Sequence, residues 1–154
     1  MLDIPAIVNL LGYSEKNAGM LEILAAYGIK MPLKRPERGE DQVNFETESG
    51  LEFCLVEAED FQNFSDRHTE GELILSTVFI IPKRLKGQEL ILPYGLTFDL
   101  TRDSAYELLG PSEWCNNRLD NHRWRFDGIR ILIGFGDGGE TVREISISSD
   151  IIRD

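Results

Sequence analysis

The sequence lacks the features that mark membrane, secreted and metal-binding proteins. Its 154 residues contain no apolar run near the roughly 18 residues that a membrane helix needs. Residues 1–16 carry neither a basic n-region nor a small-residue cleavage site, so we expect a cytoplasmic protein without membrane contact. The two cysteines, Cys54 and Cys115, lie far apart in sequence. This spacing predicts reduced thiols and neither a disulfide framework nor a metal knuckle.

Catalytic signatures are equally scarce. Of the two histidines, His122 falls on the core face of a predicted hairpin, and His68 falls in an acidic loop without an evident catalytic partner. The glycines of residues 133–140 are not followed by the Lys-Ser/Thr pair and helix of a phosphate loop. The acids lack the spacing of a calcium loop. We therefore expect no catalytic residues, no metal and no cofactor, and a small enzyme that uses the acidic loop remains an alternative.

Positive charge is in short supply. There are 16 basic and 27 acidic residues, and the net charge of -11 argues against direct binding of nucleic acid. Residues 37–72 hold 12 of the acids and only 2 of the bases, whereas the rest of the chain is nearly balanced. A segment of this kind is either a solvated acidic face or a surface that meets a basic partner. Its concentration in one part of the chain favours the second interpretation.

The first half of the chain predicts two helices followed by three strands. Residues 5–11 form a short helix, and Ser14 is the expected N-cap of the second helix, which ends at Gly28. Residues 42–46 and 51–57 alternate apolar and polar side chains on either side of a Ser49-Gly50 turn, as antiparallel strands do. Residues 73–81 are apolar at both parities, which indicates a central strand.

The second half begins with the segment LPYGLTFDLTRDSAYELLGP at residues 92–111. Thr101 is the expected N-cap of a short helix that Gly110 ends. The helix is too short to be stable alone, so it must pack against the sheet that follows it in sequence.

A tight hairpin follows at residues 122–133. Asp127-Gly128 is the expected two-residue turn, which places His122, Trp124 and Phe126 on the core side. The same register places Arg125 opposite Arg130, and Glu144 on a third strand at 141–148 is the expected acid beside them.

The two halves repeat the same order of elements. Residues 1–81 form a first repeat, residues 82–91 a linker and residues 92–154 a second repeat within a single domain of residues 1–154. We therefore expect the α+β class: two tandem helix-plus-three-strand repeats that share one antiparallel sheet of about six strands, with the helices on one face.

The segment LPYGLTF followed by TRDSAYELLGP and an aromatic hairpin resembles a signature of immunity proteins from bacterial polymorphic toxin systems and secretion-system effector pairs, such as those of type VI secretion. The repeat is similar to the helix-plus-sheet unit of the beta-lactamase inhibitor protein. The resemblance implies a cytosolic antitoxin that binds one cognate protein toxin and occludes its basic active cleft. An adaptor or chaperone for a secreted effector would use the same surface and stays open as an alternative.

Two surfaces are candidates for partner binding. The first is the acidic loop at residues 57–72, where Phe61 and Phe64 either anchor a partner or pin the loop to the core. The second is the open face of the sheet, with an acidic half and a basic half whose charges either bind a partner or pair with each other. The predicted partner-binding residues are Glu46, Glu48, Glu57, Glu59, Asp60, Phe61, Phe64, Asp66, Arg123 and Arg125.

Overall fold

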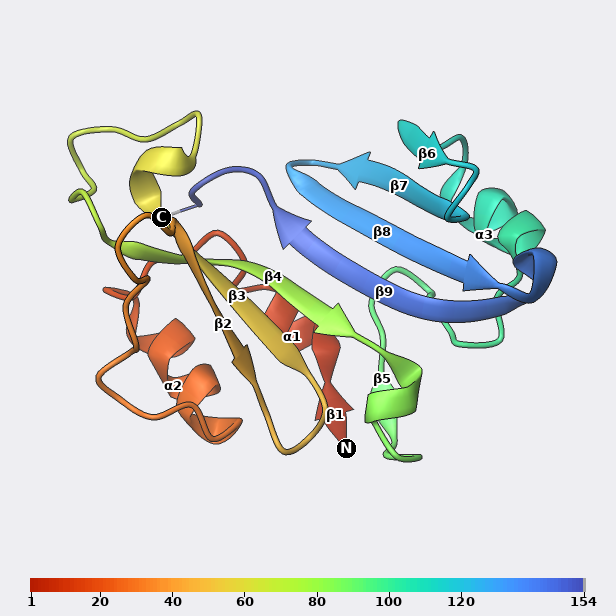
Figure 1. Ribbon diagram of the computed structural model, residues 1–154, viewed down its shortest axis with the longest axis horizontal. Helices are drawn as coiled ribbons and strands as arrows, with labels where there is room; N and C mark the ends of the chain where they lie inside the picture. Colours follow the sequence, from red (N-terminus) through yellow and green to blue (C-terminus); the bar gives the residue numbers. More distant parts are fainter. Residues whose placement is uncertain (154) are drawn as a thin grey trace.

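A seven-stranded antiparallel sheet runs through the computed structural model, which describes residues 1–153. The strand order is β2-β3-β4-β9-β8-β7-β6, so β4 and β9 meet at the centre while β2 and β6 form the edges (Figure 1). A separate parallel pair joins β1 to β5. The strands are β1 (Leu2–Asp3), β2 (Gln42–Glu46), β3 (Glu52–Glu57), β4 (Leu73–Ile80), β5 (Leu90–Ile91), β6 (Trp114–Asn116), β7 (Asn121–Phe126), β8 (Ile129–Gly136) and β9 (Thr141–Ser149).

Three α-helices accompany this sheet, so the predicted α+β class is confirmed. They are α1 (Ile4–Val8), α2 (Ala18–Ala26) and α3 (Arg102–Leu109), and three 3-10 turns are η1 (Ala58–Asp60), η2 (Pro82–Arg84) and η3 (Asp137–Gly139). Figure 1 shows α1 and α2 near β2, β3 and β4, and α3 near β6 and β7 at the other end. Thr101 caps α3 as predicted: its Oγ accepts a hydrogen bond from the Ser104 N–H, and Gly110 follows the helix with φ 83°.

One face of the sheet carries the main hydrophobic core. The alternating side chains of each strand point to it, and apolar residues of all three helices pack against them. The fully buried members include Phe53 of β3, Leu24 of α2 and Ala105 of α3. All three helices therefore lie on the same face of the sheet, as the sequence predicts.

The predicted hairpins form, and the second has the expected register. His122 and Trp124 are buried as predicted, but the prediction that Phe126 lies in the core was wrong, because it is 37% exposed at the hairpin end and stacks on Tyr94. Phe126 pairs with Ile129, and Arg125 with Arg130, across the Asp127-Gly128 turn. Strand β2 has the predicted bounds, and Gly50 closes its hairpin with φ 94°. The main sheet gains a strand that the sequence did not predict, because the short edge strand β6 adds to β7.

The N-terminal helices differ from the prediction. Helix α1 begins at Ile4 and is capped by Asp3, and α2 is capped by Asn17, whose Oδ1 accepts a hydrogen bond from Met20 N at 3.0 Å. Ser14 is not the N-cap. Its backbone instead forms an isolated antiparallel β-bridge with Ile74 of β4, so the segment before α2 runs beside that strand. Within residues 1–153, no helix combines the length and apolar character that crossing a membrane requires.

Candidate functional site

Four carboxylates gather where β2 begins and β3 ends. Antiparallel pairing brings Asp41 beside Glu57, whose N–H donates a hydrogen bond to the Asp41 carbonyl at 3.0 Å. Strand β3 then turns directly into η1, which places Glu59 and Asp60 at the same corner. We call Asp41, Glu57, Glu59 and Asp60 the carboxylate corner.

Burial and neighbouring acids raise the pKa of two of the four carboxyl groups in the corner. Partial burial and the neighbouring Glu59 raise the pKa of Glu57. Partial burial and the charges of Asp41 and Glu59 raise the pKa of Asp60. Glu59 differs, because a hydrogen bond from the Gly71 N–H at 2.8 Å lowers its pKa and holds its charge in place. A cation that approached the corner would relieve this repulsion.

The predicted acidic residues lack basic partners. Within residues 1–153, none of the six forms an ion pair, although most of the protein's arginines do. Glu46 and Glu48 are exposed at the far end of β2, and Asp66 is exposed in the acidic loop. These six carboxylates are thus not neutralised by direct ion pairs with the described residues, although Asp60 lies in one small pocket with Arg125 and Arg130. The six residues are Glu46, Glu48, Glu57, Glu59, Asp60 and Asp66.

Phe61 and Phe64 lie on the face of the sheet opposite the main core. Both are partly buried and pack against a small separate cluster of Ala58, Ile74 and Ile152. Asn63, between them in sequence, exchanges two hydrogen bonds with the backbone of Ile152, at 2.8 and 2.9 Å. The two rings therefore help to pin the acidic loop to the protein, and their remaining exposed edges lie beside the acids.

The acidic loop is also fixed at its end by a charged cluster. Glu72 is buried and contacts His68 Nδ1 at 3.0 Å and Lys16 Nζ at 2.9 Å. Only 6% of the His68 side chain is exposed. The sequence carries no sign of this contact, because it does not show that Glu72, four residues after His68, turns inward.

The basic half of the open face is internally paired. The Glu113 carboxylate forms ion pairs with Arg123 at 2.9 Å and with Arg125 at 3.3 Å. Asp150 contacts Arg125 at 2.8 Å and Arg130 at 3.8 Å. Arg123 also lies over the ring of Trp114, which is half exposed on β6.

The prediction that Glu144 lies beside Arg125 and Arg130 was therefore wrong. Glu144 contacts Arg143 instead, at 3.5 Å, and Asp150 takes the expected place of Glu144. The chain turns back after β9, and the Asp150 N–H donates to the Gly128 carbonyl at 3.1 Å. Strand parity alone could not reveal this turn.

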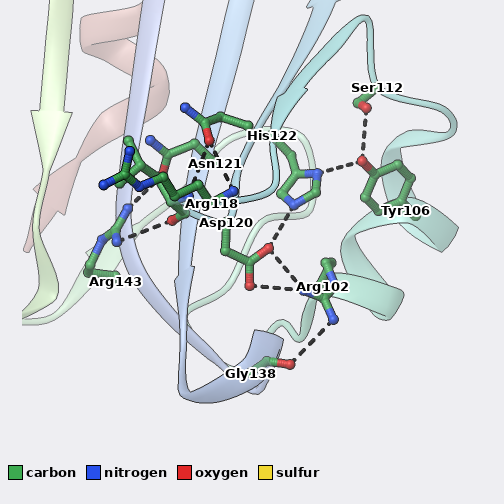
Figure 2. Close-up of polar contacts among 11 residues, drawn as sticks. Arg102, Tyr106, Ser112, Arg118, Asp120, Asn121, His122, Gly138 and Arg143 are labelled. Carbon is green, nitrogen blue, oxygen red and sulfur yellow. Dashed lines mark hydrogen bonds and ion pairs between the residues drawn. The ribbon is translucent and has the colours of Figure 1, made fainter.

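The most connected polar network lies elsewhere, between α3 and β7 (Figure 2). His122 Nε2 lies 2.8 Å from the Asp120 carboxylate, and its Nδ1 lies 2.6 Å from the Tyr106 hydroxyl. The Tyr106 hydroxyl also forms a hydrogen bond with the Ser112 hydroxyl at 2.8 Å. Arg102 donates hydrogen bonds to both carboxylate oxygens of Asp120, at 2.9 and 3.0 Å. The sequence placed His122 on the core face but gave no sign of this network.

The network has an electrostatic consequence. Burial alone would raise the pKa of Asp120, but hydrogen bonds and charge from His122 and Arg102 outweigh burial and lower it. Arg102 also reaches the Gly138 carbonyl at 3.3 Å, so one set of contacts joins α3, the loop before β7 and η3. We interpret the network as a brace that holds α3 on the sheet.

The acidic residues that the structure describes do not form a cluster with metal-binding geometry. Among residues 1–153, no group of three or more His, Cys, Asp or Glu side chains is arranged to hold a metal ion.

Comparisons with known proteins give little to build on. No family model and no curated protein matches the chain. A solved structure of a DUF4309 family protein, YjgB, from Bacillus subtilis is similar over 83% of this chain and 76% of that chain, at 10% identity and a TM-score of 0.40. This level of similarity assigns no function to the chain.

Proposed function

We propose that this chain is a cytosolic immunity protein that binds a cognate protein toxin and covers the toxin's basic active cleft with its acidic surface. The carboxylate corner carries the proposal, because its acids repel each other and have no basic partner among the described residues. A complementary basic surface would gain the attraction that the protein does not supply internally. The acids would also steer the encounter and raise the association rate, which suits an inhibitor that must act early.

The contrast between the two halves of the open face supports this choice. Arg123 and Arg125 are already neutralised by Glu113 and Asp150, so they offer a partner little free charge. Among residues 1–153 the acids of the carboxylate corner form no ion pair, although Asp60 lines a small pocket with Arg125 and Arg130. Phe61 and Phe64 add partly exposed apolar edges beside these acids, as the anchors of an interface do.

The strand order supports the related proposal of two repeats, residues 1–81 and 92–154, with residues 82–91 between them. In the first half, α2 is followed by the three antiparallel strands β2, β3 and β4, and in the second half α3 is followed by the short edge strand β6 and then by β7, β8 and β9. The last strands of the two halves, β4 and β9, pair within the sheet, as two copies of one unit would if β6 is an addition to the second copy. This arrangement agrees with the resemblance of the sequence to immunity proteins built on this unit.

The proposal is tested by finding the partner. We expect the tagged protein, expressed in its native host, to co-purify with the product of an adjacent gene that encodes a toxin domain. Co-expression should restore the growth of cells that produce this toxin. Absence of a stoichiometric partner, together with failure to protect against the neighbouring toxin, would end the proposal. A stoichiometric partner without toxicity would favour an adaptor or chaperone instead.

A further inference from the structure

Strand β2 has a free hydrogen-bonding edge. Glu57 N donates to Asp41 O, and Thr47 N donates to Leu51 O, each at 3.0 Å, so the odd-numbered residues 41–47 bond inward to β3. In an antiparallel pair the intervening residues point their N–H and C=O groups the other way. The backbones of Gln42, Asn44 and Glu46 therefore face outward. Within residues 1–153, no other segment bonds to them.

A groove runs beside this edge. It has a volume of about 590 Å³ and lies between β2 and the preceding loop, with a lining of residues 34, 35, 37 and 39–44. The lining carries the cations Lys34 and Arg35 and the acids Glu37, Glu40 and Asp41, and Arg35 is already paired with Glu15. Figure 1 shows β2 at the outer margin of the sheet, next to the connection from α2. Exposed edges of this kind are usually covered or blocked, since they pair readily with another strand. Here the edge is open and has room beside it.

The charge around the edge selects the occupant. The carboxylate corner stands at the start of β2, while Glu46 and Glu48 stand exposed at its end. A second copy of this chain would bring the same acids against them, and like charges on paired strands are destabilising. A strand with lysine or arginine side chains would meet opposite charge at both ends.

We propose that an extended segment of a basic protein binds beside β2. It adds to the sheet as a further strand through the outward backbone groups of Gln42, Asn44 and Glu46. This inference rests on the proposed function, since the basic protein would be the toxin. It adds the manner of binding: backbone hydrogen bonds fix the segment, and its basic side chains contact the carboxylate corner and Glu46. The acidic surface and the open edge then form one site.

The test uses a short peptide that alternates lysine with valine and a fully N-methylated analogue of the same charge. The analogue keeps the electrostatic attraction but cannot donate backbone hydrogen bonds. The protein variants are Asn44→Pro, which removes one outward N–H, and Asn44→Ala, which keeps it and loses only the side-chain bond to Glu52. Proline is tolerated at an edge position whose N–H faces outward. Binding is measured by calorimetry at low salt, and amide shifts in NMR spectra locate the peptide.

We expect the N-methylated peptide to bind about tenfold more weakly than the parent, and Asn44→Pro to weaken the parent by a similar factor. Asn44→Ala should keep affinity within about twofold. Amide shifts should be greatest at Gln42, Asn44 and Glu46. If Asn44→Pro does not fold, the N-methylated arm decides alone.

Three results would overturn the inference: no binding of the parent peptide, equal binding of both peptides, or a β2-dependent dimer of the protein alone. Two further outcomes distinguish this inference from the proposed function. A toxin that is captured normally by Asn44→Pro but lost on charge reversal of Glu59 and Asp60 would remove strand addition and leave the immunity function standing. Edge binding of the peptide without any toxin partner would do the reverse.

Discussion

Asp150 neutralises Arg125 at the exposed end of the β7–β8 hairpin, with its carboxylate 2.8 Å from Arg125 Nη2. Arg125 stands directly opposite Arg130, and Asp150 also lies within 3.8 Å of that second guanidinium. Two arginines in direct cross-strand contact would repel each other without it. Asp150→Asn should therefore lower the free energy of unfolding by about 1 kcal/mol at low salt, and by less at high salt.

Urea unfolding measures this difference. Glu144→Gln is the matched control, because Glu144 pairs only with the exposed Arg143 and should change stability by less than about 0.5 kcal/mol. Equal effects of the two variants would contradict the assignment of Asp150.

The brace between α3 and β7 predicts a second stability effect. Tyr106→Phe removes the hydroxyl that contacts His122 Nδ1 and Ser112, and leaves the buried imidazole nitrogen without its partner. We expect a loss of about 1 to 2 kcal/mol in the free energy of unfolding. The control is Tyr94→Phe, since Tyr94 is 43% exposed and its hydroxyl forms no hydrogen bond with the described residues. Similar losses in the two variants would exclude a role for the network in holding α3.

Acid should weaken the same brace. The pKa of Asp120 is lowered in the folded protein, so its contribution is present above the unfolded-state pKa and disappears as the pH falls through the folded value. The difference in free energy of unfolding between the wild type and Asp120→Asn should thus be large at neutral pH and should disappear in acid. A gap that stays constant with pH would show that the charge of Asp120 is immaterial.

The carboxylate corner predicts the opposite dependence of stability on pH. The pKa of Asp60 is raised, so the folded protein loses stability as the pH rises through this value and the carboxyl group ionises. Asp60→Asn should be more stable than the wild type at neutral pH and equal to it in strong acid. The same change should weaken partner binding, as expected where a site keeps unfavourable charges for function. A destabilising Asp60→Asn would mean that the corner's charges are satisfied internally.

The turn that closes the β2–β3 hairpin is held by close packing. Gly50 has φ 94°, and a Cβ there would lie 2.2 Å from the Arg84 carbonyl oxygen. Gly50→Ala should cost more than about 2 kcal/mol. Gly39→Ala, at φ 88° with open space around it, should cost about 1 kcal/mol. Thermal unfolding distinguishes them, and matching losses would show that backbone strain alone explains both.

The sequence predicted the parts of this protein that local rules determine. The Asp127-Gly128 turn allows one register, so the pairing of Phe126 with Ile129 could be read directly. Thr101 and Gly110 set the ends of α3 for the same reason. These rules act over a few residues and depend little on the rest of the fold.

The rest depended on contacts between distant segments. Asp150 reaches the arginines only because the chain turns back after β9, and Glu72 reaches His68 and Lys16 only once the loop is folded against the N-terminal segment. The strand β6 and the pair β1–β5 are too short for a sequence pattern to show. The sequence shows that the candidate acids lie in one segment, but which of them meet at one corner required the pairing of β2 with β3.

The most direct test of the proposed function is the association rate of the protein with its co-purifying toxin. We expect Glu59→Lys combined with Asp60→Lys to slow association by about tenfold or more at low salt and to flatten its dependence on ionic strength. The control combines Glu22→Lys with Glu107→Lys, which makes the same change in net charge at exposed helix positions and should alter the rate by less than about twofold. Equal rates for the two double variants would contradict the claim that the carboxylate corner receives the toxin.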